Sequence, residues 1–449
     1  MRSASTVPPG PRLPPVVQAV RYVFDFPRFW ASSRRRYGRT WTLRLPGFPP
    51  GVVTSDRDAI RRLLTGDPLT KRHGNDLLRP FLGDGSIMLL EPPDHLARRR
   101  LELGPFHGDR VRSYEARVRE LMDEEVDGWR EGTVVEVHPR AQALTLAIIL
   151  ELVLGVRDPA LRTGLRELFE GLTSPKGNLG LFLGETVMRR SWWNLASRSA
   201  WGLADRMDAL LFAQIAATRA DPELEDRVDV LAMLMTARDE DGEGLSDQEL
   251  RDELVTLVTA GHETTATAIA WAADLLAHHP AVAARVRETM GEGDRSYLKA
   301  TAKEVLRVRT VAPISAARMP LEPFGIDGWL LGPDVAILVN AEDLHHDPEV
   351  HPDPDAFRPE RFLDDPPDGY SYLPFGGGAH RCLGAALATL ELETAIELMT
   401  TRCDLAPAGP PSGSMRRGVT LAPSSRGAVG VMQTRPAETA APPPMESVR

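Results

Sequence analysis

The most constraining feature of this sequence lies near its end, where residues 375–384 read FGGGAHRCLG. Glycines allow a backbone to adopt positive φ and to approach a bound group closely. The basic neighbours of Cys382, His380 and Arg381, are expected to lower the pKa of its thiol and so favour the thiolate, which is the form that binds a metal ion. An isolated cysteine is more often a small buried apolar residue. The glycines and the two basic residues favour the metal-ligand interpretation here.

The spacing of this stretch is also informative. Phe375, Gly378, His380, Cys382 and Gly384 occupy the five positions that define the heme-binding signature of the cytochrome P450 family, which the stretch therefore resembles. The resemblance implies heme b (iron-protoporphyrin IX) as cofactor, with the Cys382 thiolate as the axial ligand of the iron. It also implies contacts with the cofactor from Phe375, Gly376, Gly378, His380 and Gly384 in the loop, and from His95, Arg99 and Arg318, which together with His380 would bind the heme propionates.

Composition favours a soluble globular protein. Of the 449 residues, 42% are hydrophobic and 26% charged, which is ordinary for a protein with a large core. A net charge of −10 argues against a general nucleic-acid binder. No signal peptide is recognisable, and no apolar stretch reaches the roughly 20 residues that span a bilayer. The two cysteines, Cys382 and Cys403, suit a reducing compartment, so we expect a cytoplasmic protein without a membrane anchor.

We expect three parts in the chain: a Pro-rich leader at 1–15, a single domain at 16–433 and a disordered tail at 434–449. Patterns of helical period dominate the domain, with short β-like runs between them. The predicted fold class is therefore mainly α with small β-sheets. The resemblance implies the cytochrome P450 fold, a helix-rich triangular single domain with a small β lobe.

Periodicity and turn residues also predict the individual elements. We expect a helix at 16–37, a half-buried strand at 40–45 in a hairpin with 52–54, mainly helices from 56 to 280 with flexible loops at 74–93 and 174–184, and strands at 329–339 and 416–431.

A long helix begins at Ser246, which forms a capping box with Glu249, and should end before Pro280. At 1.5 Å per residue it would be roughly 50 Å long and cross the whole domain. Its middle reads AGHETT at 260–265, where glycine and β-branched threonine both disfavour a helix. In one interpretation Glu263 faces solvent and the threonine hydroxyls bond to carbonyls of the preceding turn.

The second interpretation of this segment rests on the resemblance, because AGHETT matches the oxygen-activating motif of the P450 family. The match implies that Thr264 relays protons to O2, with Glu263 as its acidic partner. Ala260 and Gly261 would make room for O2 where the helix is locally widened.

Glu304 and Arg307 are three residues apart and so share one face of a helix. A Glu-x-x-Arg pair is weak evidence alone, but Pro359-Glu360-Arg361-Phe362 follows at a distance typical of the family. The resemblance implies that Glu304 and Arg307 pair with Arg361 and hold the coil that presents the cysteine loop. These three residues would be structural rather than catalytic.

His95 and Arg99 are four residues apart and share a helix face. Such a pair could simply be a solvated basic helix end, but its spacing resembles the family helix that binds the propionates. Arg98, Arg100 and Arg381 would then surround the thiolate side of the heme. There they could offer a docking surface to an acidic redox protein.

The resemblance implies a soluble, bacterial-type heme-thiolate monooxygenase that activates O2 with two externally supplied electrons. The electrons would come from a separate ferredoxin or flavodoxin and its reductase, and the substrate would be a hydrophobic small molecule such as a fatty acyl, terpenoid or polyketide-like compound. A heme-thiolate peroxygenase or isomerase is an alternative, as is a heme-based ligand sensor. The expected walls of the substrate site are 74–89, 175–193, 255–261, 312–316 and the turn 423–425.

Overall fold

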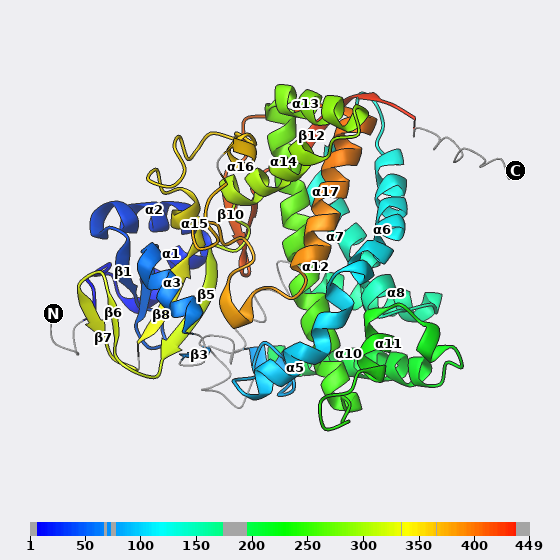
Figure 1. The fold of residues 1–449 in the computed structure, drawn as a ribbon, viewed down its shortest axis with the longest axis horizontal. Helices are drawn as coiled ribbons and strands as arrows, with labels where there is room; N and C mark the ends of the chain where they lie inside the picture. The colour runs from blue at the N-terminus through cyan, green and yellow to red at the C-terminus, as the bar shows by residue number, and fades with distance from the viewer. Residues whose placement is uncertain are drawn as a thin grey trace, which may run out of the picture.

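The computed structural model describes residues 7–66, 70–72, 78–173, 195–333, 335–364 and 366–436. Figure 1 shows a lobe rich in β-strands beside a larger lobe of helices, and the long helix α12 (Asp247–His278) runs through the helical lobe. The structure confirms the predicted fold class, which is mainly α with small β-sheets.

The other helices and short helical turns have the bounds α1 (Pro15–Phe24), α2 (Phe26–Tyr37), α3 (Arg57–Thr65), α4 (Arg79–Leu82), α5 (Asp94–Leu103), η3 (Gly104–Phe106), α6 (Asp109–Asp127), α7 (Val137–Ile148), η4 (Ile149–Val153), α8 (Pro159–Thr173), α10 (Leu195–Arg219), η5 (Leu224–Asp226), α11 (Val230–Thr236), α13 (Pro280–Gly291), α14 (Ser296–Val308), α15 (Ala341–His345), α16 (Arg361–Asp364), η6 (Gly378–His380) and α17 (Ala385–Arg402).

The strands of the described residues form small sheets, the largest in the order β1-β2-β8-β5-β3. In this sheet β2 and β8 are parallel and the other neighbours are antiparallel. The strands are β1 (Thr40–Leu43), β2 (Gly51–Thr54), β3 (Thr70–Arg72), β4 (Val134–Glu136), β5 (Ile314–Pro320), β6 (Phe324–Ile326), β7 (Trp329–Leu331), β8 (Ala336–Asn340), β9 (Cys403–Pro407), β10 (Ser414–Arg417), β11 (Thr420–Pro423) and β12 (Ala428–Thr434).

The predicted hairpin near the start is present as the antiparallel pair β1–β2. All residues of both strands are buried, so the expected half-buried alternation is wrong. Two neighbours cover the hairpin. Trp30 of α2 packs on Trp41 with ring centroids 5.0 Å apart. The segment expected to be a leader hydrogen-bonds to Thr42, whose amide donates to Pro9 O (3.2 Å) and whose hydroxyl donates to Pro8 O (2.6 Å).

At the other end of the chain, β12 continues to Thr434, the first residue of the expected tail. Arg435 follows and forms an ion pair with Asp404 of β9. The packed domain therefore extends a little beyond the predicted boundary, and residues 437–449 lie outside the described residues.

The single helix predicted at 16–37 is two helices, α1 and α2, which meet at Asp25. Pro27 lies in the first turn of α2, where its missing N–H would have no helical partner in any case. The same missing N–H prevents α1 from continuing through this position. The amphipathic pattern runs through both helices, which is why it did not reveal the break.

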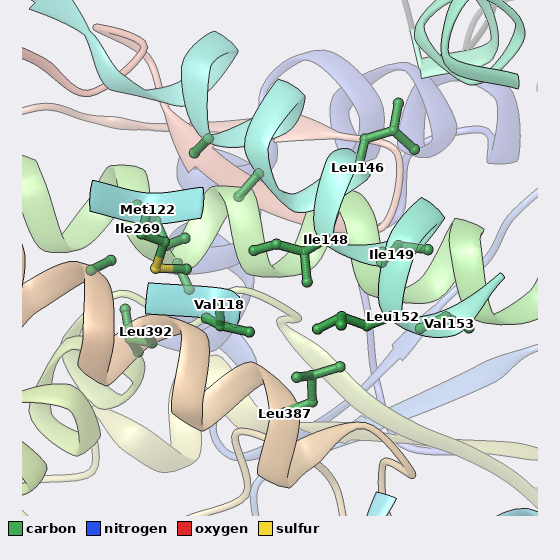
Figure 2. Close-up of a cluster of buried hydrophobic side chains, with 14 of the residues drawn as sticks. Val118, Met122, Leu146, Ile148, Ile149, Leu152, Val153, Ile269, Leu387 and Leu392 are labelled. Atoms are coloured by element: carbon green, nitrogen blue, oxygen red, sulfur yellow. The ribbon is translucent and has the colours of Figure 1, made fainter. Parts of the chain in front are cut away.

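Helix α12 begins and ends where the sequence predicts. The Ser246 hydroxyl accepts from the Glu249 amide (3.3 Å), and the Glu249 carboxylate accepts from the Ser246 amide (2.9 Å), so the capping box is confirmed. The helix has 32 residues and ends before Pro280. It packs against α7 and α17 in the core of the helical lobe, which fixes its position relative to α17. Figure 2 shows part of this core: Val118, Met122, Leu146, Ile148, Ile149, Leu152, Val153, Ile269, Leu387 and Leu392.

Candidate heme-binding site

The cysteine loop is shaped by two glycines with positive φ, Gly376 (65°) and Gly378 (68°). A Cβ atom at Gly376 would lie 3.0 Å from the Ser315 carbonyl oxygen, so a larger residue would strain both the backbone and the packing against β5. The Cys382 amide donates to Phe375 O (2.9 Å) and closes the loop just before α17. The glycines are thus required by the backbone path that presents the cysteine.

Cys382 presents an exposed thiol, whereas Cys403 is buried. A Cβ atom at Gly384 would meet no other atom within 4 Å, so the loop is open beside the cysteine. Protein atoms on the other sides of the thiol desolvate it and raise its pKa. The Gly384 amide and the charges of Arg99 and Arg381 lower the pKa, but they do not offset this desolvation. Arg381 thus lowers the thiol pKa as expected, but in the protein alone burial outweighs it and the net change is upward.

His95 of α5 and His380 of the cysteine loop lie in direct contact. Nε2 of His95 and Nδ1 of His380 are 2.8 Å apart, and the ring centroids are 3.9 Å apart. Arg99, one turn further along α5, is half-buried and lies close enough to Cys382 for their charges to interact. Arg318 is buried in β5, the strand that packs against the loop. The structure thus brings His95, Arg99 and His380 together beside Cys382.

The middle of α12 is exposed although most of this helix is buried. Thr259 and Ala260 have exposed side chains, whereas Val255 and Val258 in the preceding turn are fully buried. The Thr264 hydroxyl donates to Ala260 O (2.7 Å), as the backbone-bonded interpretation of the threonines predicts. An exposed stretch halfway along a central helix indicates an opening beside the helix at this point. In Figure 1 the chain that leads into α17 lies between the β lobe and α12, and α17, which follows the cysteine loop, packs against α12.

Gly261 has a clear packing role. A Cβ atom at this position would lie 3.1 Å from Cδ1 of Ile149, so the glycine allows the turn η4 to approach α12. Helix α12 is assigned as α-helix without a break from Asp247 to His278. The π-helical turn of this region is η4 itself.

Glu263 does not face solvent, so the interpretation in which its side chain is solvated is wrong. Its carboxylate accepts from Gln142 Nε2 (2.5 Å) and lies 3.4 Å from His138 Nε2 and 3.2 Å from Arg417 Nε. Burial would raise the pKa of Glu263, but the hydrogen bond with His138 and the charges of His138 and Arg417 hold it below its ordinary value. Glu263 is therefore an ionised carboxylate, held on one side of α12 by α7 and by β10.

Arg417, His138 and Gln142 were not identified from the sequence. His138 and Gln142 are four residues apart on one face of α7, and Arg417 lies in a short β-like run. Nothing local connects any of them with Glu263, because each reaches it only through the fold.

These observations fit a heme. An exposed thiol lies at the end of a glycine-shaped loop, the loop is open at Gly384, and imidazole and guanidinium groups surround it. The exposed stretch of α12 supplies small side chains, Thr259 and Ala260, on a helix that packs against α17. A family model described as "Cytochrome P450" matches residues 8–428.

The chain belongs to the cytochrome P450 family. It is accordingly a P450 monooxygenase, an oxidoreductase whose cofactor is heme iron and whose reaction uses O2 and electrons from a redox partner. Its curated relatives include two proteins of Mycobacterium tuberculosis (strain ATCC 25618 / H37Rv). "Putative cytochrome P450 135B1" is 37% identical over 413 residues, which are 90% of this chain and 86% of that protein. "Putative cytochrome P450 138" is 33% identical over 447 residues, which are 96% of this chain and 99% of that protein.

Solved P450 structures share the fold. The retinoic acid bound cyanobacterial CYP120A1 superimposes with a TM-score of 0.81 at 23% identity, over 95% of this chain and 99% of that chain. The cytochrome P450DA heme domain superimposes with a TM-score of 0.83 at 22% identity, over 97% and 99%. In the described parts of this P450, no helix has both the length and the apolar character needed to cross a membrane.

The predicted Glu304–Arg307–Arg361 group is present and fully internal. Arg307 donates to both carboxylate oxygens of Glu304 (2.7 and 2.9 Å), and Arg361 Nε donates to Oε1 (3.0 Å). Arg307 also donates to the backbone carbonyls of Pro354 (2.7 Å) and Ala356 (3.0 Å). The group thus binds the coil before α16 to α14, as the P450 resemblance implies.

The predicted role of Arg98 in a docking surface is wrong. Its guanidinium is buried and donates to Glu253 (2.9 Å) and to Gly85 O (2.8 Å), and it also pairs with Glu249. Arg98 therefore connects α5 and the loop before it to α12. Arg100 is exposed, but its guanidinium already pairs with Glu240. The sequence could not reveal the acidic partners of Arg98 and Arg100, because they lie about 140 to 155 residues away.

The structure also revises the predicted substrate site of this P450. Residues 73–77 and 175–193 lie outside the described residues. The predicted turn at 423–425 is present, because the chain turns at Ser424 and Ser425 between β11 and β12 and the Arg426 amide donates to Pro423 O (3.0 Å). Ser424 and Ser425 line a cavity of about 240 Å³ with Asp274. Asp274 is 14 residues beyond Ala260 on α12, which is about 21 Å along the helix, so this turn is distant from the exposed stretch.

Proposed function

We propose that this P450 binds heme b through Cys382 and oxidises a hydrophobic small molecule, such as a fatty acyl, terpenoid or polyketide-like compound. The observation that supports this most is the joint exposure of Cys382 in the glycine-shaped loop and of Thr259 and Ala260 in the middle of α12, a helix that is mostly buried. When bound, heme would supply the iron at which O2 is activated. The small, weakly polar side chains of the exposed stretch suit an apolar substrate.

The cationic groups beside the loop would fix the cofactor. His95 and His380 are already in contact, Arg99 lies beside them, and Arg318 lies in the adjacent strand β5. Carboxylates of a buried cofactor need such charged hydrogen-bond donors. We assign these four side chains to the propionates.

Thr264 and Glu263 would deliver the proton. The Thr264 hydroxyl donates to Ala260 O in the exposed stretch, and a χ1 rotation would release this donor from the backbone. Glu263 is ionised at neutral pH, because its neighbours hold its pKa low. It can therefore accept a proton and pass it on, whereas Thr264 holds the proton to be donated.

Two electrons would come from a separate ferredoxin or flavodoxin and its reductase, and we place the reaction in the cytoplasm. Arg381 is exposed next to Cys382 and offers an acidic donor a contact on this side. Both cysteines are free, which suits a reducing compartment. Comparing turnover with a ferredoxin and with a flavodoxin would identify the donor.

The proton-delivery assignment is tested with Thr264→Ala. With a substrate found by its spectral shift, we expect the ratio of product formed to electrons consumed to fall by about tenfold or more, while substrate affinity is retained. Thr265→Ala, at the adjacent buried threonine, should keep the wild-type ratio. An unchanged ratio in Thr264→Ala, or product with peroxide but none with O2 and reductant, contradicts the proposal and favours a peroxygenase.

A further inference from the structure

Helix α1 exposes an apolar face. At 100° per residue its exposed apolar side chains fall within a sector of about 100° on one side of the helix. They are Val16 (62% exposed), Val17 (39%), Val20 (51%) and Phe24 (76%). Isolated exposed apolar residues are normal, but a contiguous group on one helix face is typical of an interaction surface.

The opposite face holds α1 firmly on the protein. Gln18 is fully buried, and its side-chain amide donates to Pro11 O (3.1 Å) and Leu13 O (2.8 Å). Tyr22 packs against Phe26 and Trp30 of α2 with ring centroids 5.7 and 6.2 Å apart. The exposed face therefore belongs to a helix whose orientation is fixed by its contacts.

Exposed arginines accompany this apolar face. Residues 7–44 contain eight arginines and one aspartate in a chain whose net charge is −10. Arg34 and Arg39 have acidic partners. Within the described parts of the chain, no ion pair is made by the exposed side chains of Arg12, Arg21, Arg28, Arg35 and Arg36.

We propose that α1 and these arginines, here called the N-terminal surface, bind the surface of an anionic lipid bilayer. An apolar helix face with exposed cationic side chains on the same helix (Arg21) and on the adjoining helix α2 is the pattern of a segment that lies in the plane of a membrane interface. Helix α1 has 10 residues and is about 15 Å long, so it lies on a bilayer and does not span it.

The positive charge of the N-terminal surface distinguishes lipid from the other partners that could bind an apolar helix face. A second copy of this chain would bring a surface of the same positive sign, and like charges oppose a symmetric contact. An acidic protein would pair with the arginines. It would not explain why four apolar side chains lie together on one face of α1 with no charged residue between them. Anionic lipid matches both, with head groups for the arginines and acyl chains for the valines and Phe24.

The experiment uses the full-length holoprotein and vesicles made either of phosphatidylcholine alone or of phosphatidylcholine and phosphatidylglycerol in equal parts. Cosedimentation should show binding to the mixed vesicles at least about tenfold tighter than to phosphatidylcholine, and high salt should weaken it because salt screens the arginines. Val20→Ser with Phe24→Ser, and separately Arg28→Glu with Arg35→Glu, should each reduce binding to the mixed vesicles about tenfold or more.

Matched control variants lie on the other side of the molecule from α1, around α6 and β12 (Figure 1). Val134→Ser with Met432→Ser changes two equally exposed apolar residues, and Arg112→Glu with Arg130→Glu changes two exposed arginines. Both control pairs should bind vesicles as the wild type does. All variants should retain the heme content and melting temperature of the wild type, because none touches the heme-binding site.

Three outcomes overturn the proposal. Equal binding to both kinds of vesicle removes the electrostatic recognition of lipid. Loss of binding in the control variants places the contact elsewhere on the protein. A dimer that is detected by light scattering and disappears in the Val20→Ser, Phe24→Ser variant, without vesicle binding by the wild type, assigns the surface to a second copy of the chain.

Discussion

Glu391 is a buried carboxyl group that the proposed reaction does not use. It lies on α17 with 3% of its surface exposed, and its Oε2 atom has no hydrogen-bond partner among the described residues. Burial raises its pKa from the ordinary 4.5 to about 8. The folded protein therefore keeps a proton that the unfolded chain releases. Stability from this group is complete below about pH 4.5 and is lost as the pH rises toward 8.

We predict that Glu391→Gln flattens this dependence, because glutamine stays neutral at every pH. Between pH 5 and pH 8 the free energy of unfolding of the wild type should fall relative to that of the variant by up to about 1.4 kcal/mol per pH unit. Urea unfolding at a series of pH values measures the difference. Glu288→Gln, at an exposed position on α13, should follow the wild type. Parallel curves for Glu391→Gln and the wild type would mean that Glu391 ionises normally.

Arg417 acts on Glu263 by charge, with 3.2 Å between Nε and the carboxylate. It is one of the groups that lower the pKa of Glu263, so Arg417→Gln should raise that pKa. The acidic limb of the pH profile of product formation should then move to higher pH, by about one unit or less for a partly solvated pair. Substrate-dependent turnover between pH 5 and pH 8 measures the shift. Arg426→Gln, an exposed arginine that pairs with Glu136, should leave the limb in place. If the limb does not move in Arg417→Gln, the pair does not control proton delivery.

At the scale of elements, the Glu304–Arg307–Arg361 group connects α14 with the coil that leads toward the cysteine loop. Glu304→Gln leaves two buried guanidinium groups without their counter-charge, and we expect it to lower the free energy of unfolding by about 3–5 kcal/mol. Heme content after purification should fall with it, because the coil would no longer be held. Urea unfolding and the reduced carbon monoxide spectrum measure the two effects.

A surface pair provides the control for this prediction. Glu349 pairs with Arg39 but is 63% exposed, so Glu349→Gln should cost less than about 1 kcal/mol and leave heme content unchanged. Similar losses in the two variants would show that the internal position of Glu304 has no special effect on stability.

Elements with a local signal were predicted well. The capping box at Ser246 and the proline at 280 mark both ends of α12, and two glycines before Cys382 adopt the positive φ that the sequence allows. The break between α1 and α2 was missed because the amphipathic pattern continues through it, although Pro27 was visible in the sequence. Capping residues and prolines therefore predicted the ends of helices more reliably than the amphipathic period did.

At the scale of the whole molecule, the sequence predicted the fold class and the loop that presents the cysteine, but not the partners of most charged side chains. Arg98 was expected on a surface and is buried against α12, and the contact of Arg417 with Glu263 had no local signal. Such partners are separated by about 150 residues, and only the packed tertiary structure brings them together. The positions of charges relative to the core are therefore the part that single-sequence reasoning could not supply.

The N-terminal segment shows how a stretch without regular structure can belong to the fold. Pro8 and Pro9 accept hydrogen bonds from Thr42, and Gln18 donates to Pro11 and Leu13. A Cβ atom at Gly10 would lie 1.9 Å from Thr42 O, so the segment packs closely on β1. The expectation of a simple leader at 1–15 therefore understates its structural role from residue 7 onward.

A chain that begins at Val7 should consequently match the full-length protein in urea unfolding, whereas a chain that begins at Pro15 should lose about 2–4 kcal/mol. The estimate follows from four hydrogen bonds at about 0.5–1 kcal/mol each. Fluorescence should report the loss, because Leu13 of this segment packs against the core cluster that contains Trp30 and Trp41. Equal stability of the two shortened chains would show that these contacts stabilise nothing. Equal loss in both would instead assign the stabilisation to residues 1–6.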